Sequence, residues 1–243
     1  MVAQPKVWFV NIFKSLKRIF GKPGKDEILE GSVVPVLFKL SWPIMISSLL
    51  QTMYNLIDTI WIGRLPGDEG VNSMAAMSLA WPLVFLMISV GMGLGIAALA
   101  LVSQHTGAKN FEEANKDAGQ LFFVLIVLSI ILGLIGFIFT EPLVTLLSGG
   151  GPLVFYSTQY LQVIFLGLPF MMLFFAFSFI MRAWGDTITP MLLMLLSVVI
   201  NIILDPILIF GSGHPLFLGL TTPELPLVGI VPHFGIQGAA IAT

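Results

Sequence analysis

Long uninterrupted apolar stretches dominate this sequence and limit the folds that it can adopt. Several exceed the roughly 20 residues that a helix needs to cross a hydrocarbon core of about 30 Å. Inside a bilayer every backbone N–H and C=O must be paired within the protein, and α-helices meet this condition. Composition agrees, because 57% of the residues are apolar and only 10% are charged, against about 25% charged in soluble domains. We therefore predict an all-α integral membrane protein.

Polar residues divide the chain into an N-terminal segment and a set of spans. Residues 1–32 are basic and carry apolar residues at helical spacing, which is typical of an amphipathic helix on a cytoplasmic, anionic membrane surface. Residues 33–243 form the transmembrane lobe. Its spans are predicted at about 33–63, 75–102, 121–139, 153–181 and 188–210, with the start of a sixth at 235–243.

The last predicted span is too short to cross a membrane. A helix over residues 235–243 would cover about 13.5 Å, less than half of a bilayer core. We therefore expect the chain to be a fragment with a truncated sixth helix, or to end in a re-entrant stub.

The distribution of Lys and Arg favours one orientation. If the N-terminus is cytoplasmic, ten of the eleven Lys and Arg residues lie on the cytoplasmic side, and only Arg64 lies outside. Cytoplasmic loops of membrane proteins carry such an excess of basic residues. We predict a multi-pass protein of the cell membrane with its N-terminus in the cytoplasm.

Asp58 and Asp205 are the only carboxylates well inside apolar spans. An ionisable group at the centre of a span costs a few kcal/mol, so it indicates function unless a structural role explains it. Tyr54 and Asn55 lie within one turn of Asp58, and Asn201 lies one turn before Asp205. This pattern favours a site for a hydrated cation or a proton, although one acid could instead bond a neighbouring helix for structure alone.

Pro206 directly follows Asp205 and is expected to weaken the helix at this point. A proline inside a helix removes one donor and leaves the carbonyl four residues earlier, here that of Ile202, without its partner. A free carbonyl, an amide and a carboxylate together suit a cation or proton site. The same residues are also compatible with a simple proline kink solvated by Asn201.

Two further patterns have alternative interpretations. Gly91 and Gly95 form a small-xxx-small pair, which close helix packing explains. Phenylalanine and methionine crowd residues 170–181, where they could bind drugs or, as we favour, face lipid.

Several functional classes lack their sequence signatures. The chain has no cysteine, which excludes disulfides and thiolate metal sites. It has no GxSxG, HExxH or phosphate-binding glycine loop, and His105, His214 and His233 are too scattered for a metal site. We expect no enzyme activity and no metal site. We also expect no nucleic-acid partner, because a basic segment beside a membrane favours anionic lipid.

Four motifs resemble those of multidrug and toxic compound extrusion (MATE) transporters. LSWP at 40–43 with QTMYNLIDTIWIG at 51–63 is similar to their first helix, and NIILDPILIFG at 201–211 to their fifth. RAWGDT at 182–187 matches the loop before the fifth helix, and GAAIAT at 238–243 matches the start of the sixth. The resemblance covers about residues 30–243, with all four motifs in the family's order.

The resemblance implies the N-terminal six-helix lobe of a twelve-helix antiporter, with its C-terminal lobe missing. Such a protein expels drugs and organic cations in exchange for H+ or Na+ and needs no cofactor beyond the coupling ion. The family's N-lobe site would consist of Asp58 and Asp205, with Tyr54 and Asn201 beside them and Thr243 from the sixth helix. Pro43 matches a proline at which the first helix of some members bends.

Other functions remain as alternatives. A lipid-linked oligosaccharide flippase of the same superfamily would be expected to have basic residues at its span centres, and this chain has none. A non-transporting accessory or truncated membrane protein is a further alternative, and a membrane-embedded enzyme is disfavoured by the missing motifs. If Asp58 and Asp205 meet in a dry lobe, desolvation and repulsion predict that the pair holds at least one proton near neutral pH.

Overall fold

The structure, a computed structural model, describes residues 31–211 and 232–242. Nearly all of the predicted amphipathic segment 1–32 lies outside these residues, and so does Thr243. The described residues form helices and connecting turns, without a strand. The helices are α3 (Val33–Ile62), α4 (Asp68–Gly107), α5 (Phe111–Ser148), α6 (Pro152–Ala183), α7 (Ile188–Phe210) and α8 (Ile236–Ala242).

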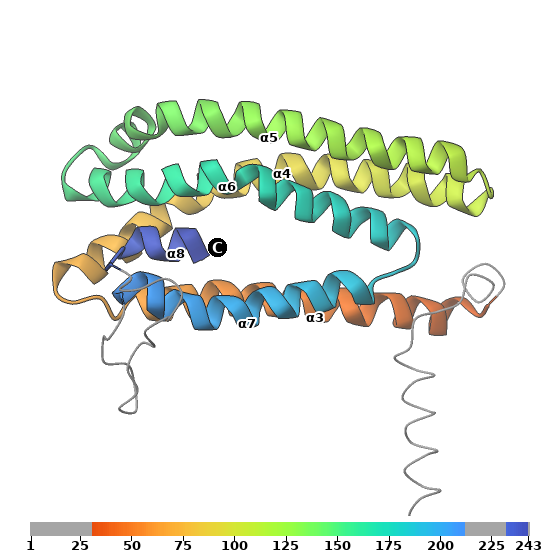
Figure 1. Cartoon of the computed structure of the whole chain (residues 1–243), viewed down its shortest axis with the longest axis horizontal. Helices are drawn as coiled ribbons and strands as arrows, with labels where there is room; N and C mark the ends of the chain where they lie inside the picture. Colours follow the sequence, from red (N-terminus) through yellow and green to blue (C-terminus); the bar gives the residue numbers. More distant parts are fainter. Residues whose placement is uncertain (1–30, 212–231, 243) are drawn as a thin grey trace, which may run out of the picture.

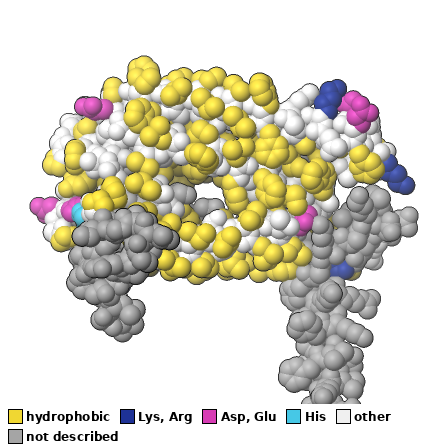
Figure 2. Space-filling model, in the orientation of Figure 1, with side chains coloured by type: hydrophobic (Ala, Val, Ile, Leu, Met, Phe, Trp, Pro, Cys, Tyr) yellow, Lys and Arg dark blue, Asp and Glu magenta, His cyan; other side chains and the backbone are white. Residues whose placement is uncertain are grey.

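Five of these helices, α3 to α7, are long and apolar enough to cross a membrane. The prediction of an all-α multi-pass membrane protein is thereby confirmed. Figure 2 shows hydrophobic side chains over most of the visible described surface, whereas the charged side chains lie mainly toward its two ends. This distribution is the one that a surrounding bilayer requires.

Helices α4 and α5 extend beyond the apolar spans predicted for them. α4 begins at Asp68 and ends at Gly107, and α5 already begins at Phe111, within a stretch expected to separate two spans. The side chain of Asn110 caps α5 by accepting a hydrogen bond from the backbone N–H of Glu113 at 3.4 Å. Pro142 does not end α5, which continues to Ser148, because a proline removes only one backbone donor.

The helices form two layers (Figure 1). α4, α5 and α6 pack against one another in one layer, and α3 packs against α7 in the other. The short helix α8 lies between the layers at one end and contacts both α6 and α7. Elsewhere the layers make few contacts, and Figure 2 shows the molecule hollowed between them.

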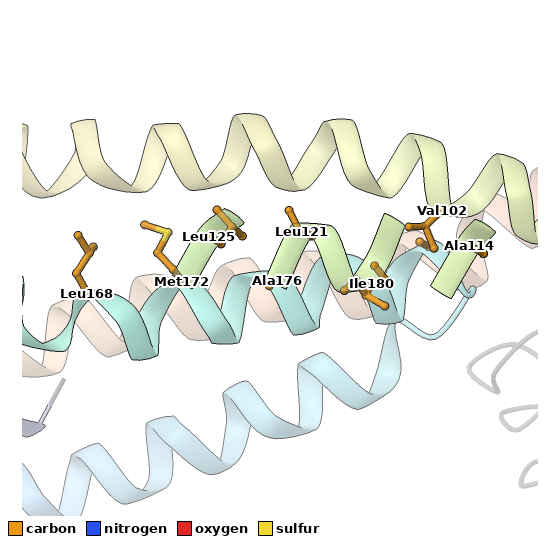
Figure 3. Close-up of a cluster of buried hydrophobic side chains, with 10 residues drawn as sticks. Val102, Ala114, Leu121, Leu125, Leu168, Met172, Ala176 and Ile180 are labelled. Carbon is orange, nitrogen blue, oxygen red and sulfur yellow. The ribbon is translucent and has the colours of Figure 1, made fainter. Parts of the chain in front are cut away.

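The core of the layer of α4, α5 and α6 combines large side chains of α6 with glycines of α4 that leave space for them. Figure 3 shows Leu168, Met172, Ala176 and Ile180 of α6 packed with residues of α4 and α5. Gly91 and Gly95 make room on α4 for Met172 and Phe179, so the predicted packing role of this glycine pair is confirmed.

Candidate cation site

Asn201 connects the two buried acids across the α3–α7 contact. Its Nδ2 donates hydrogen bonds to Oδ1 of Asp205 at 2.8 Å and to Oδ1 of Asp58 at 3.1 Å. The exposed fractions are 4% for Asp58, 1% for Asn201 and 0% for Asp205. The structure therefore brings together three of the residues that the sequence indicated.

Helical periodicity explains why these side chains meet. On α7, Met194, Val198, Asn201 and Asp205 are all buried and follow one another at intervals of three or four residues, so they form one stripe. On α3, Tyr54 and Asp58 are buried and lie one turn apart. Apolar residues occupy the neighbouring part of this contact, where Tyr54 packs with Met194 and Val198. The polar residues continue the same stripe, so they face the neighbouring helix and not the lipid.

Two acceptor atoms in this group face no N–H or hydroxyl donor among the described residues. They are Oδ1 of Asn201 and Oδ2 of Asp205, and both are buried. An unpaired buried acceptor costs about 1–3 kcal/mol, and more when the group is charged. A proton on the acid pair or a small cation beside these oxygens would remove this cost, so the donor set fits a hard monovalent cation as well as a proton.

Tyr54 links this group to α8. Its hydroxyl donates a hydrogen bond to the backbone carbonyl of Ala242 at 3.2 Å, and its side chain is only 5% exposed. The end of α8 therefore contacts Tyr54, which lies one turn from Asp58 on α3. Thr243, the next predicted site residue, lies outside the described residues.

Asn55 does not join the hydrogen-bonded group. It is half-buried, and its backbone carbonyl accepts a hydrogen bond from the hydroxyl of Thr59 at 2.8 Å. Its side-chain amide makes no hydrogen bond to either carboxyl group within the described chain.

Pro43 and Pro206 both lie buried inside continuous helices. Pro206 follows Asp205 directly and is itself part of the buried face of α7. At the other proline, the Ser47 hydroxyl donates to the carbonyl of Pro43 at 2.8 Å, a local bond that often accompanies helix bending. Both prolines are therefore placed where a helix could change shape without unfolding.

Tyr160 of α6 is a site residue that the sequence reasoning missed. It is half-buried and lies close enough to Asp58 and Asp205 to interact electrostatically with both. The available signal was the spacing of Tyr156 and Tyr160, which places two of the chain's three tyrosines on one face of a largely apolar helix. Tyr160 brings the layer of α4, α5 and α6 to a site that otherwise belongs to α3 and α7.

The comparisons with known proteins agree with this arrangement. The family model MatE matches residues 43–207. The probable multidrug resistance protein YoeA of Bacillus subtilis is 34% identical over 201 residues, which are 83% of this chain and 39% of that protein. The multidrug export protein MepA of Staphylococcus haemolyticus is 35% identical over 191 residues, 77% of this chain and 42% of that protein.

A solved structure gives the same result for the fold. A MOP superfamily transporter from Pyrococcus furiosus superimposes with a TM-score of 0.74 and 27% identity, over 91% of this chain and 44% of that one. A multi-pass helical bundle with an acid pair buried between its helices is the class that fold and site define. This chain belongs to the MATE family of transporters, and its helices form the N-terminal lobe of that fold.

The family and the fold class predicted from the sequence are thus confirmed. The chain spans about 40% of the length of the curated relatives it matches.

Proposed function

We propose that this chain is the N-terminal lobe of a cation-coupled exporter, which expels drugs and organic cations across the cell membrane in exchange for H+ or Na+. The observation that carries the proposal is the single amide of Asn201 bridging Asp58 and Asp205, with acceptor oxygens left unpaired beside it. The multidrug exporters among its relatives support the substrate class.

The acid pair supplies a reason for coupling. Two ionised carboxylates that share one neutral donor in a dry environment repel each other, so the pair favours one proton or one cation. A proton, a sodium ion and a cationic substrate would compete for the same negative charge. Export follows if the pair exchanges its coupling ion for substrate on one side of the membrane and reverses this exchange on the other.

The remaining parts of the proposal concern the whole transporter. The matched region covers only 39% and 42% of these two relatives, which supports a second lobe that completes the substrate path. The excess of basic residues in the N-terminal segment and in the loops assigned to the cytoplasm favours a cytoplasmic N-terminus. The described Lys and Arg residues lie toward helix ends and in turns, so a flippase for lipid-linked oligosaccharides has less support.

Coupled efflux from proteoliposomes tests the proposal. The full-length exporter that contains this lobe would be reconstituted, and efflux of a fluorescent organic cation would be followed under an imposed pH or Na+ gradient. We expect Asp58→Asn and Asp205→Asn to abolish gradient-driven efflux while the protein is still produced and inserted. Glu113→Gln is the matched control, because Glu113 is a carboxylate that pairs with Lys116 on the exposed start of α5. Unchanged efflux in both aspartate variants would refute the assignment of the site.

A further inference from the structure

Glu69 of α4 and His233, just before α8, form a contact at the end of the lobe where α8 begins. Nε2 of His233 lies 3.9 Å from Oε1 of Glu69, and the two side chains are 44% and 28% exposed. Glu69 belongs to the first turn of α4, whereas His233 lies just before α8. Figure 2 shows a histidine next to acidic side chains at the end of the molecule where α8 begins. The contact therefore joins the start of α8 to α4 at an exposed position.

The backbone beside His233 is fixed to the end of α7. The N–H of Phe234 donates to the carbonyl of Leu208 at 3.2 Å, and the N–H of Gly235 donates to that of Ile209 at 3.1 Å. Gly235 has a positive φ of 53°, and a Cβ at this residue would come within 2.6 Å of Oε1 of Glu69. The carboxylate of Glu69 thus lies directly against the turn that begins α8.

Ala242, the last described residue of α8, contacts Tyr54 beside the cation site. The carbonyl of Ala242 accepts the hydrogen bond from Tyr54, one turn from Asp58 on α3. Ile236 to Ala242 form one continuous helix, so a shift at the start of α8 moves Ala242 as well. The Glu69–His233 contact can therefore affect the surroundings of the acid pair without touching it.

The charge of His233 decides whether this contact is attractive. A separation of 3.9 Å is too long for a hydrogen bond, so a neutral imidazole gains little from Glu69. A protonated imidazole forms an ion pair at this distance, and histidine is the side chain that ordinarily changes charge between pH 5 and 8. The other described titratable residues at this end are Asp68, Arg64, Tyr156 and Glu141, none of which is a histidine.

We infer that Glu69 and His233 form a pH-dependent latch, which holds α8 against α4 when His233 is protonated. The side chains are partly exposed at the outer end of the lobe in the proposed orientation, so the latch responds to the pH outside. Asp68 lies next to Glu69 in the first turn of α4. The effect on transport rests on the proposed function, whereas the latch itself can be measured without transport.

The distance between α4 and α8 is the direct readout. The lobe has no native cysteine, so spin labels can be attached at Val71→Cys on α4 and Ile241→Cys on α8, whose side chains are 70% and 50% exposed. Electron–electron distance measurements on the labelled full-length protein in nanodiscs would be made from pH 5 to pH 8. We expect a shorter and narrower distribution at low pH, with the latched population changing by a factor of about two to five, as for a partly exposed ion pair.

Four variants separate the latch from other pH effects. His233→Gln and Glu69→Gln should keep the high-pH distribution at every pH. The control is His105→Gln, which removes another histidine–carboxylate pair, His105 with Asp117 at 3.5 Å, inside the α4–α5 layer. It should respond to pH like the parent, and so should Asp58→Asn, which removes titration of the acid pair.

The latch is refuted if the parent distribution does not change with pH, or if the change persists in His233→Gln. Failure of the proposed antiport would appear as uncoupled efflux and would leave these distances unaffected. The two proposals can therefore fail separately.

Discussion

Replacing Asn201 by leucine should destabilise the lobe, because Asn201 is the shared donor to both carboxyl groups. Leucine has a similar shape, so the change removes the amide and leaves little cavity. Both acids would then lose the hydrogen bond that Nδ2 donates, at 2.8 Å to Asp205 and 3.1 Å to Asp58. The consequence is a buried acid pair with no neutral donor between its members.

The size of the effect follows from these two bonds. A hydrogen bond to a charged group contributes about 1.5–3 kcal/mol, and one to a neutral group contributes about 1 kcal/mol. With one acid ionised and the other protonated, the loss is about 2.5–4 kcal/mol. Removing Oδ1 of Asn201, a buried acceptor without a partner, returns about 1 kcal/mol. We expect a net destabilisation of about 1.5–3 kcal/mol, which lowers the Tm.

Thermal unfolding of the purified full-length protein in detergent, followed by circular dichroism, measures this change. Ser197→Ala is the matched control, since Ser197 lies one turn earlier on α7 and its exposed hydroxyl donates only to the carbonyl of Leu193. This control should change the stability by less than about 0.5 kcal/mol. In an Asp58→Asn, Asp205→Asn background the cost of Asn201→Leu should fall by at least about 1 kcal/mol, because no charge remains to be bonded. An equal cost in both backgrounds would refute the reasoning.

Three further substitutions have defined outcomes. Gly133→Ala should destabilise the protein by about 1–3 kcal/mol, since its Cβ would lie 2.6 Å from the carbonyl oxygen of Phe165. The control Gly119→Ala in the same helix places its Cβ in open space and should be neutral or stabilising. Thermal unfolding compares the two variants. Pro43→Ala should retain cation binding but slow transport; a turnover equal to that of the parent would make the proline a packing feature. Tyr160→Phe should keep the fold and alter the pH dependence of efflux, because it removes the phenol near both acids; an unchanged pH profile would exclude that role.

The sequence predicted the fold class well because membrane solvation leaves few choices. Apolar length alone required helices, and a carboxylate such as Asp58 or Asp205 inside an apolar span has few explanations besides function. The ends of the helices were less predictable. α4 and α5 continue into water beyond their apolar spans, where local features such as the Asn110 cap and not hydrophobicity decide where a helix ends.

The details of the site could be predicted only in part. Tyr54 and Asn55 both lie within one turn of Asp58 in the sequence, and only the contact with α7 and α8 decides that Tyr54 is the buried one. Tyr160 and the Glu69–His233 pair depend on how α6 and α8 meet the other helices. No periodicity within a single helix contains that information, because these contacts join residues far apart in the chain.

Infrared difference spectroscopy of the purified full-length protein tests the central claim most directly, because it detects the protonated carboxyl group itself. The account predicts that adding Na+ or an organic cation removes a protonated-carboxyl band, and that this change is absent in the Asp58→Asn, Asp205→Asn double variant. The same loss of signal in the double variant, or no carboxyl signal in the parent, would contradict the assignment of Asp58, Asn201 and Asp205 as the coupling site.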